Sequence, residues 1–257
     1  MSEFSNALGF YTLFRKECRR FLRVAVQTVL TPVLTSMLYL AVFAQVLADR
    51  VQVYDGIGYV QFLVPGLVMM TVIQNAYANS SSSLIQSKMN GSLNFLLVSP
   101  ISAGEIFAAY LTASIVRGAM VGAGVLCVAL LFVDLPLSHP WAVILGVILS
   151  SALLAALGMV AGIWGEQFEQ MAVFQNFIIM PLSFLSGVFY SIHSLPDWWR
   201  QLSHFNPFFY TVDAFRYGFL GHSDIDPSIS FSVMAVSLLL VGGLAWAMLA
   251  RGYKIRE

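Results

Sequence analysis

The chain has 257 residues, of which 58% are hydrophobic and only 10% are charged, and its mean hydropathy is +0.79. A soluble core needs more polar surface than this composition provides, so the chain is predicted to be an integral membrane protein. Thirteen basic and thirteen acidic residues balance to a net charge of zero, which gives no reason to expect nucleic acid as a partner.

Long apolar runs recur along the whole chain. A helix needs about 20 apolar residues to cross a bilayer core of about 30 Å. Six such runs lie near residues 24–48, 59–84, 105–133, 141–164, 171–191 and 229–250. The first run follows basic residues, as in a secretory signal, but it is too long for one and we expect it to be retained. The sequence therefore predicts an all-α integral membrane protein with six transmembrane helices in one domain, residues 1–257.

The segment before the first span, residues 1–23, combines apolar and basic residues at helical spacing. The apolar positions are Phe4, Ala7, Leu8, Tyr11, Phe14, Cys18, Phe21 and Leu22, and between them lie Lys16, Arg19, Arg20 and Arg23. This pattern predicts an amphipathic helix in the cytoplasmic interface of the membrane. The alternative is a plain continuation of the first span into the cytosol.

The basic residues are distributed unevenly between the two sides of this topology. Six spans put both chain ends on one side, and nine of the thirteen basic residues fall there: Arg15, Lys16, Arg19, Arg20, Arg23, Lys88, Arg251, Lys254 and Arg256. Short loops rich in Lys and Arg stay in the cytoplasm. Both termini are therefore predicted to be cytoplasmic.

Several polar residues lie within the spans. Asn75, Asn79 and the serines 80–83 near the end of the second span either bond between helices or line a cytoplasmic vestibule. Arg117, near the middle of the third span, would cost roughly 2.5 to 3.5 kcal/mol if it faced lipid. We expect it at a dimer interface, a neighbouring helix or the translocation path. Close helix approach is predicted where small residues recur, at Gly118, Gly122, Gly158 and Gly162 among others.

A short apolar segment, residues 87–100, lies between the second and third spans and is too short to cross the bilayer. Its apolar residues Met89, Leu93, Leu96 and Leu97 share one helical face, and Ser99-Pro100 stops the helix. The pattern predicts an amphipathic cytoplasmic helix that inserts into a groove on a partner. The alternative is a helix that only lies on the inner leaflet.

The sequence of the longest extracytoplasmic connection, residues 192–228, predicts two short helices. Ser194 is the expected N-cap of the first, with Pro196 near its first turn, and Asn206 caps the second, with Pro207 at its first position. Their many aromatic residues suit the outer headgroup zone. Asp213 and Arg216 are three residues apart, so we expect an ion pair that is either a structural staple or a substrate contact.

The sequence contains no motif for several common kinds of chemistry. It has no Walker lysine loop, no acidic residue in the middle of a span, and none of the common hydrolase or metalloprotease motifs. The four histidines are scattered in loops, and Cys18 and Cys127 are expected to be free thiols. We therefore expect no catalytic residue, no metal and no cofactor, and if the chain moves a solute the energy comes from a partner.

Two motifs resemble those of a known family. The segment "NGSLNFLLVSPISAGEI" resembles the cytoplasmic coupling segment of the type-2 ABC exporter permeases. The segment "MPLSFLSGVFYSIHSLPDWWRQLSHFNPFFYTVDAFR", residues 180–216, resembles the second signature of that family. With six spans, the N-terminal helix and the length, the resemblance covers essentially the whole chain.

The resemblance implies two copies of this subunit, expected as a homodimer, joined to two copies of a separate ATP-binding cassette subunit. Coupling to that ATPase would involve Met89, Gly91, Leu93, Leu96, Leu97 and Pro100. An extracytoplasmic gate or structural motif would comprise Gly187, Pro196, Asn206, Pro207, Tyr210, Asp213 and Arg216.

The expected function is that of the membrane subunit of an ATP-driven exporter in a bacterial cytoplasmic membrane. Its substrate would be amphiphilic: a drug-like molecule, a lipid or a lipid-linked saccharide. The alternatives are a receptor or assembly scaffold that moves nothing, and a passive channel.

Overall fold

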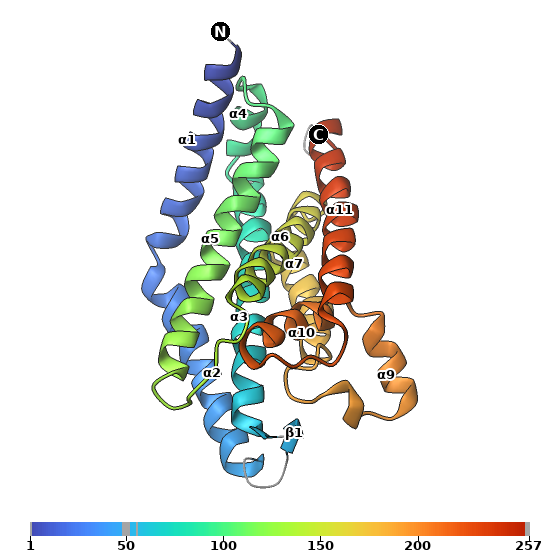
Figure 1. Cartoon of the computed structure of the whole chain (residues 1–257). Coiled ribbons are helices and arrows are strands. Elements are labelled where there is room, and N and C mark those ends of the chain that lie inside the picture. Colours follow the sequence, from blue (N-terminus) through green and yellow to red (C-terminus); the bar gives the residue numbers. More distant parts are fainter. Residues whose placement is uncertain (1, 48–51, 55, 255–257) are drawn as a thin grey trace.

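The computed structural model describes residues 2–47, 52–54 and 56–254, and the side chains of residues 2–7, 47, 52–54, 94 and 97 lie outside its described part. Nearly all of the described chain is helical (Figure 1). The α-helices are α1 (Ser2–Leu22), α2 (Ala25–Leu47), α3 (Tyr59–Met89), α4 (Ser92–Val98), α5 (Ala103–Ala129), α6 (Pro140–Trp164), α7 (Phe168–Phe174), α8 (Met180–Phe184), α9 (Asp197–His204), α10 (Pro207–Leu220) and α11 (Pro227–Arg251). The shorter elements are strands β1 (Gln52–Tyr54) and β2 (Ile57–Gly58), the π-helix η1 (Gln175–Ile179) and the 3-10 helix η2 (Ile192–Ser194).

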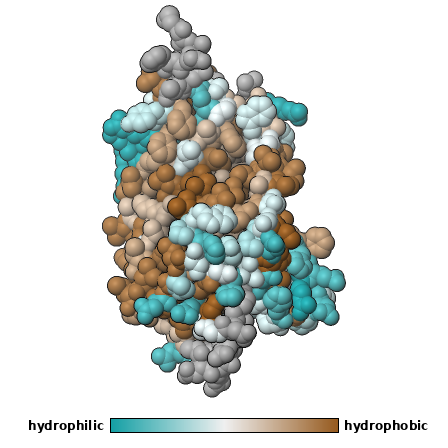
Figure 2. All heavy atoms as spheres, in the orientation of Figure 1, coloured by the Kyte–Doolittle hydropathy of each residue, from teal (hydrophilic) through white to brown (hydrophobic). Residues whose placement is uncertain are grey.

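Five helices are long and apolar enough to cross a membrane: α2, α3, α5, α6 and α11. They correspond to the predicted first, second, third, fourth and sixth spans. Apolar residues dominate the sides of the molecule and hydrophilic residues gather toward its two ends (Figure 2). The chain termini and α4 lie at the same end, and β1 lies toward the opposite end (Figure 1).

The predicted fifth span, 171–191, is not one continuous α-helix. It is divided into α7, the π-helix η1 and α8, and the helical run ends at Phe184. Pro181 has no backbone N–H to donate to the preceding turn, and π-turns accommodate such interruptions of an α-helix. Residues 168–184 rise about 26 Å as a helix, which is slightly less than the bilayer core of about 30 Å.

Helix α3 is the centre of the structure. It packs along α5 and α6 and also contacts α2 and α10. On α6, a Cβ at Gly158 would lie 2.5 Å from the carbonyl oxygen of Tyr77, and one at Gly162 would lie 3.0 Å from that of Ser81. On α5, a Cβ at Gly122 would lie 2.5 Å from a methyl group of Val72. The small residues therefore allow close helix approach, as predicted.

Helix α1 packs along α5 and is separated from α2 by a turn at Arg23 and Val24 (Figure 1). The helix itself was predicted, and its predicted apolar residues divide between a buried and an exposed side. Leu13, Glu17 and Phe21 are buried, whereas Leu8 and Tyr11 of the predicted face are exposed. The packing against α5 selects this face, and the sequence pattern did not include Leu13. A two-stranded antiparallel hairpin, β1–β2, was also not predicted.

Candidate functional site

The turn between α3 and α4 depends on a glycine. Helix α3 ends at Met89, and Gly91 precedes α4 with a φ of +67°. A side chain in this left-handed conformation would be strained, so glycine suits the position. Helix α4 ends at Val98, followed by Ser99 and Pro100. Ser102 then begins α5 with a capping box, in which its hydroxyl and backbone N–H both bond to Glu105.

The apolar residues of α4 divide between two faces, which corrects the single ridge predicted from the sequence. Leu93 is only 3% exposed and joins a buried cluster with Leu13 of α1 and Ile106 of α5. Leu96 is partly buried against the same cluster. The outward side carries Phe95, 80% exposed, and Val98, 88% exposed.

The α3–α4 junction is anchored to α6 by a lysine. The Nζ of Lys88 donates to the carbonyl oxygen of Gly165 at 2.9 Å and also to that of Ile163. These are carbonyls at the C-terminal end of α6, where a cation is favoured by the helix dipole. Met89 is exposed beside this anchor.

Three predicted polar residues of the second and third spans, Asn75, Asn79 and Arg117, form a cluster with Ser114 of α5 and Arg20 of α1. We call these five residues the Asn79 cluster. Arg117 donates to the side-chain oxygens of Asn79 at 3.4 Å and Asn75 at 3.3 Å. Asn79 donates to the hydroxyl of Ser114 at 3.0 Å. Of the three environments expected for Arg117, the structure therefore places it against a neighbouring helix, α3.

Arg20 ties α1 to the same cluster. Its Nη2 donates to the backbone oxygen of Asn79 at 2.8 Å and to the side-chain oxygen at 2.9 Å. Its Nε pairs with the buried carboxylate of Glu17 at 3.1 Å. The N-terminal helix is thus joined to α3 by hydrogen bonds as well as by apolar packing.

Two N-caps were predicted in the motif that includes α8, α9 and α10. The predicted N-cap at Asn206 is confirmed: its side-chain oxygen accepts from the backbone N–H of Phe208 at 3.0 Å, and Pro207 occupies the first turn. Its amide group also donates to the carbonyl oxygen of Leu182 at 2.8 Å. The expected cap at Ser194 was wrong, because α9 begins after Pro196 and Ser194 belongs to η2.

Arg216 and Asp213 have separate partners, so the predicted ion pair was wrong. Arg216 is fully buried, donates to the carbonyl oxygen of Gly187 at 2.7 Å, and lies over the ring of Phe62 with its guanidinium carbon 3.7 Å from the ring centroid. Gly187 has a φ of +74°. In the described part of the chain, no salt bridge joins Asp213 to Arg216. Arg216 therefore links α10 to the turn after α8.

Asp213 is buried and accepts two hydrogen bonds. They come from the backbone N–H of Asp224 at 2.7 Å and from the hydroxyl of Ser230 at 3.1 Å. Burial raises the pKa of Asp213 to about 6, although these bonds and the charge of Arg216 oppose the rise. Tyr210 in the same helix donates to the carbonyl oxygen of His204 at 2.9 Å.

The aromatic residues of this region also divide, whereas both helices were expected in the outer leaflet. Those of α10 are buried, including Phe208, Phe209 and Phe215. In and after α9, Trp198 and Phe205 are largely exposed. Only α9 therefore presents an aromatic surface. Within the residues that the structure describes, no three His, Cys, Asp or Glu side chains are grouped as metal ligands.

The family follows from a comparison of the whole chain with known proteins. A family model described as the ABC-2 type transporter matches residues 9–220. The chain belongs to the ABC-2 type transporter family. The match includes the α4 segment and the α8–α10 motif, the two regions on which the resemblance was based.

Relatives of this ABC-2 permease align over nearly its full length. The inner membrane transport permease YadH of Escherichia coli strain K12 is 37% identical over 247 residues, covering 96% of each chain. Nodulation protein J of Rhizobium leguminosarum biovar viciae is 21% identical over 253 residues, again covering 96% of each chain. The family, the inner-membrane relative and the apolar helices support a multi-pass inner membrane protein that serves as a transport permease. Membership implies an ABC ATPase partner in general and a subunit that is not itself catalytic.

Sequence reasoning missed three residues of this ABC-2 permease that the geometry singles out: Phe95, Val98 and Lys88. Phe95 and Val98 are apolar residues in a seven-residue helix with leucines on several sides, so periodicity did not distinguish the buried face. Lys88 was considered only for its charge. No local signal identified its partners, because they lie 75 and 77 residues further along the chain.

Proposed function

We propose that this ABC-2 permease is the membrane subunit of an ATP-driven exporter with six membrane passages, both termini in the cytoplasm, and α1 at the cytoplasmic interface. It would act as a homodimer with two copies of a separate ABC ATPase subunit and move an amphiphilic substrate out of the cytoplasm. The observation that carries the proposal is the outward apolar face of α4 on a helix that is anchored to the spans.

Helix α4 would be the coupling helix, with roles assigned by its two faces. The exposed Phe95 and Val98 suit insertion into a groove of the ATPase subunit. Leu93 and Leu96 would transmit the motion, because their cluster includes residues of α1, α3 and α5. Gly91 would allow the turn and Pro100 would end the segment; Met89 and Leu97 stay predicted contacts.

Two grooves beside α2 are the observation that favours an amphiphilic substrate. A groove of about 190 Å³ between α2 and α3 has a mostly apolar surface with polar side chains in its lining, including Thr35, Thr71 and Asn75. An aromatic groove of about 620 Å³ is lined by Phe43, Phe189 and Trp199 among others. Tyr39 belongs to both grooves. A substrate with a polar and an apolar part would find both surfaces along one helix, where a second copy of the chain could complete the path.

The α8–α10 motif would serve this path as a structural support. Arg216, Gly187 and Asn206 fix α10 to the end of α8, and Phe184, Leu185, Phe189 and Tyr190 from the same region line the aromatic groove. We propose that Pro196, Pro207, Tyr210 and Asp213 act with them by shaping the outer end of the path and not by catalysis.

The test is Phe95→Asp in the full-length chain. We expect the ATPase subunit, identified among proteins that co-purify with the wild type, to be lost, and the associated ATP hydrolysis to fall at least tenfold. Phe205→Asp is the matched control, because Phe205 is 86% exposed but lies beyond α9. Leu93→Asp is a poorer test, since it would also disrupt the buried cluster.

Other outcomes separate the alternatives. If the wild type co-purifies with no ATPase under conditions that preserve another cassette complex from the same membranes, a receptor or scaffold is favoured. If the chain alone passes solute in liposomes, it is a channel. If Phe95→Asp and Phe205→Asp reduced ATPase co-purification and ATP hydrolysis equally, α4 would not be the coupling helix.

A further inference from the structure

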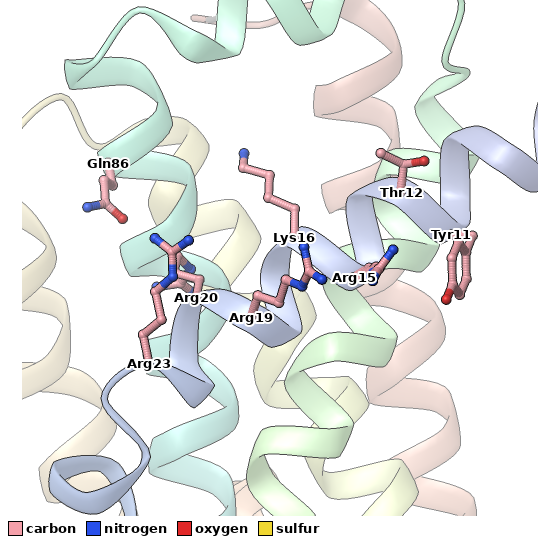
Figure 3. A pocket seen from close by; sticks show the side chains of 8 residues that line it. All are labelled: Tyr11, Thr12, Arg15, Lys16, Arg19, Arg20, Arg23 and Gln86. Atoms are coloured by element: carbon pink, nitrogen blue, oxygen red, sulfur yellow. The ribbon is translucent and has the colours of Figure 1, made fainter.

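A groove with a strongly basic lining lies between α1 and α3. It has a volume of about 540 Å³. Its basic residues come from α1 and, in the case of Arg23, from the turn that follows it, and Gln86 comes from α3 (Figure 3). We call this surface the basic groove, and the side chains that define it are Arg15, Lys16, Arg19, Arg20, Arg23 and Gln86.

Two of these side chains already have partners within the protein, and one of them, Lys16, lies 3.9 Å from the carboxylate of Glu17. Arg20 bonds to Asn79, Ser82 and Glu17 and so holds the wall of the groove against α3. In the described part of the chain, no carboxylate lies within ion-pair distance of Arg15, Arg19 or Arg23. Arg15 and Arg19 are four residues apart on α1, where like charges at that spacing destabilise a helix, and Arg23 follows in the turn after α1. An anionic ligand would relieve this repulsion.

The surface next to the groove is apolar. Leu22 and Val24 are exposed where α1 ends, and Val26 and Leu30 are exposed at the beginning of α2. Helix α2 is one of the five long apolar helices, and its candidate membrane span begins at Ala25. A basic surface followed directly by exposed apolar residues is typical of the depth at which lipid headgroups meet acyl chains. This arrangement favours a lipid over an acidic protein.

We propose that the basic groove binds the phosphate headgroup of an anionic phospholipid, whose acyl chains lie along the exposed apolar residues at the start of α2. Successive arginines at this spacing are about 6 Å apart along the helix axis, so two guanidinium groups can share one phosphate. A single guanidinium group can also donate two parallel hydrogen bonds to the oxygens of one phosphate. Because Arg20 joins the groove to the Asn79 cluster, a bound lipid would stabilise α1 against α3.

The test uses the full-length protein in detergent at low salt. Phosphatidylglycerol, phosphatidylcholine and inorganic phosphate are titrated separately, and the bound lipid is measured by native mass spectrometry and the melting temperature by thermal unfolding. We expect phosphatidylglycerol alone to bind and to raise the melting temperature. Arg19→Gln/Arg23→Gln should weaken this binding by about 10- to 30-fold. The control Arg251→Gln/Lys254→Gln removes the same charge at the same end of the molecule and should bind as the wild type does.

A measurement on the wild type keeps the test decisive if the groove variant does not fold. Raising the salt to 1 M shortens the screening length to about 3 Å and should release most of the phosphatidylglycerol. Equal binding of both lipids, no effect of salt, or equal losses in groove and control variants would overturn the proposal. Stabilisation by inorganic phosphate alone would point to a soluble anion. A groove variant that keeps its lipid but loses a protein partner would make the groove a protein interface.

Discussion

At the scale of single residues, two arginines, Arg216 and Arg117, make contacts that join separate segments of the protein. Arg216 bonds to Gly187 and lies over Phe62, and Arg117 bonds to two asparagines of α3. An arginine in an apolar surrounding is costly unless its donors are satisfied. The bonds satisfy these side chains only in part, because Arg216 Nε and Nη1 and Arg117 Nε have no hydrogen-bond partner in the described part, and neither arginine is directly paired with a carboxylate there.

Asp213 gives a prediction about pH. Its pKa rises from 3.8 to about 6 on burial, so the folded state holds the proton more tightly than the unfolded state. The stability that comes from this proton is complete below pH 4 and is lost as the pH rises through 6. In Asp213→Asn, we expect the melting temperature to change less between pH 4 and 7 than in the wild type, by the equivalent of up to about 3 kcal/mol.

The control for this measurement is Asp197→Asn, because Asp197 is an exposed carboxylate in α9. It should follow the wild-type pH profile. The same slope in all three proteins would show that Asp213 keeps an ordinary pKa and that its burial does not matter for stability.

At the scale of elements, helix contacts decide both packing and function. The α3–α6 interface depends on glycines opposite backbone carbonyls, and the α4 segment depends on the cluster around Leu93. An apolar pattern alone describes neither feature, because it does not show which neighbour a face meets. The coupling proposal therefore depends on the exposed residues of α4, whereas Leu93 and Leu96, which match the family motif, pack against the buried cluster.

Gly158→Ala tests the α3–α6 contact. A Cβ there would lie 2.5 Å from the carbonyl oxygen of Tyr77, and overpacking of this kind costs about 1 to 3 kcal/mol. We expect a lower melting temperature in detergent. Gly243→Ala is the matched control, since Gly243 lies in α11 with no atom within 4 Å of the added Cβ, and it should melt at or above the wild-type temperature. A Gly158→Ala protein as stable as the wild type would mean that α3 and α6 are not so close.

At the scale of the whole molecule, both termini and α4 lie at one end (Figure 1). Five long helices alone would put the two termini on opposite sides of a membrane. In the proposed topology, the broken helix α7–η1–α8 therefore acts as the sixth passage. The C-terminal end of this broken helix, at Phe184 and Leu185, lines the aromatic groove.

Thiol labelling tests this topology. Cys18 and Cys127 are first replaced by serine, and single cysteines are then placed at Phe95, Phe205 or Lys254. With a membrane-impermeant reagent, we expect Phe205→Cys to react in intact cells, whereas Phe95→Cys and Lys254→Cys should react only after lysis. Labelling of Phe95→Cys and Lys254→Cys from opposite sides would exclude the sixth passage. Labelling of Phe95→Cys in intact cells would place α4 outside the cytoplasm.

The sequence by itself determined the membrane class, the five long helices and the start of α10 at Asn206-Pro207. These features depend on interactions within a few residues: an apolar run matched to the bilayer, and a side chain that caps the following turn. The two family motifs could also be recognised in this way, because their residues are contiguous along the chain.

Only the tertiary structure decided which face of α4 is outward, where Arg117 lies, and which groups bind Arg216 and Asp213. The pairs concerned are far apart in the chain: Leu13 meets Leu93 in one cluster, and Arg216 bonds to Gly187. An apolar or charged residue is equally compatible with several neighbours until the helices pack. The contacts that position the candidate site are of this long-range kind, and for that reason local patterns predicted the segments of the site better than its geometry.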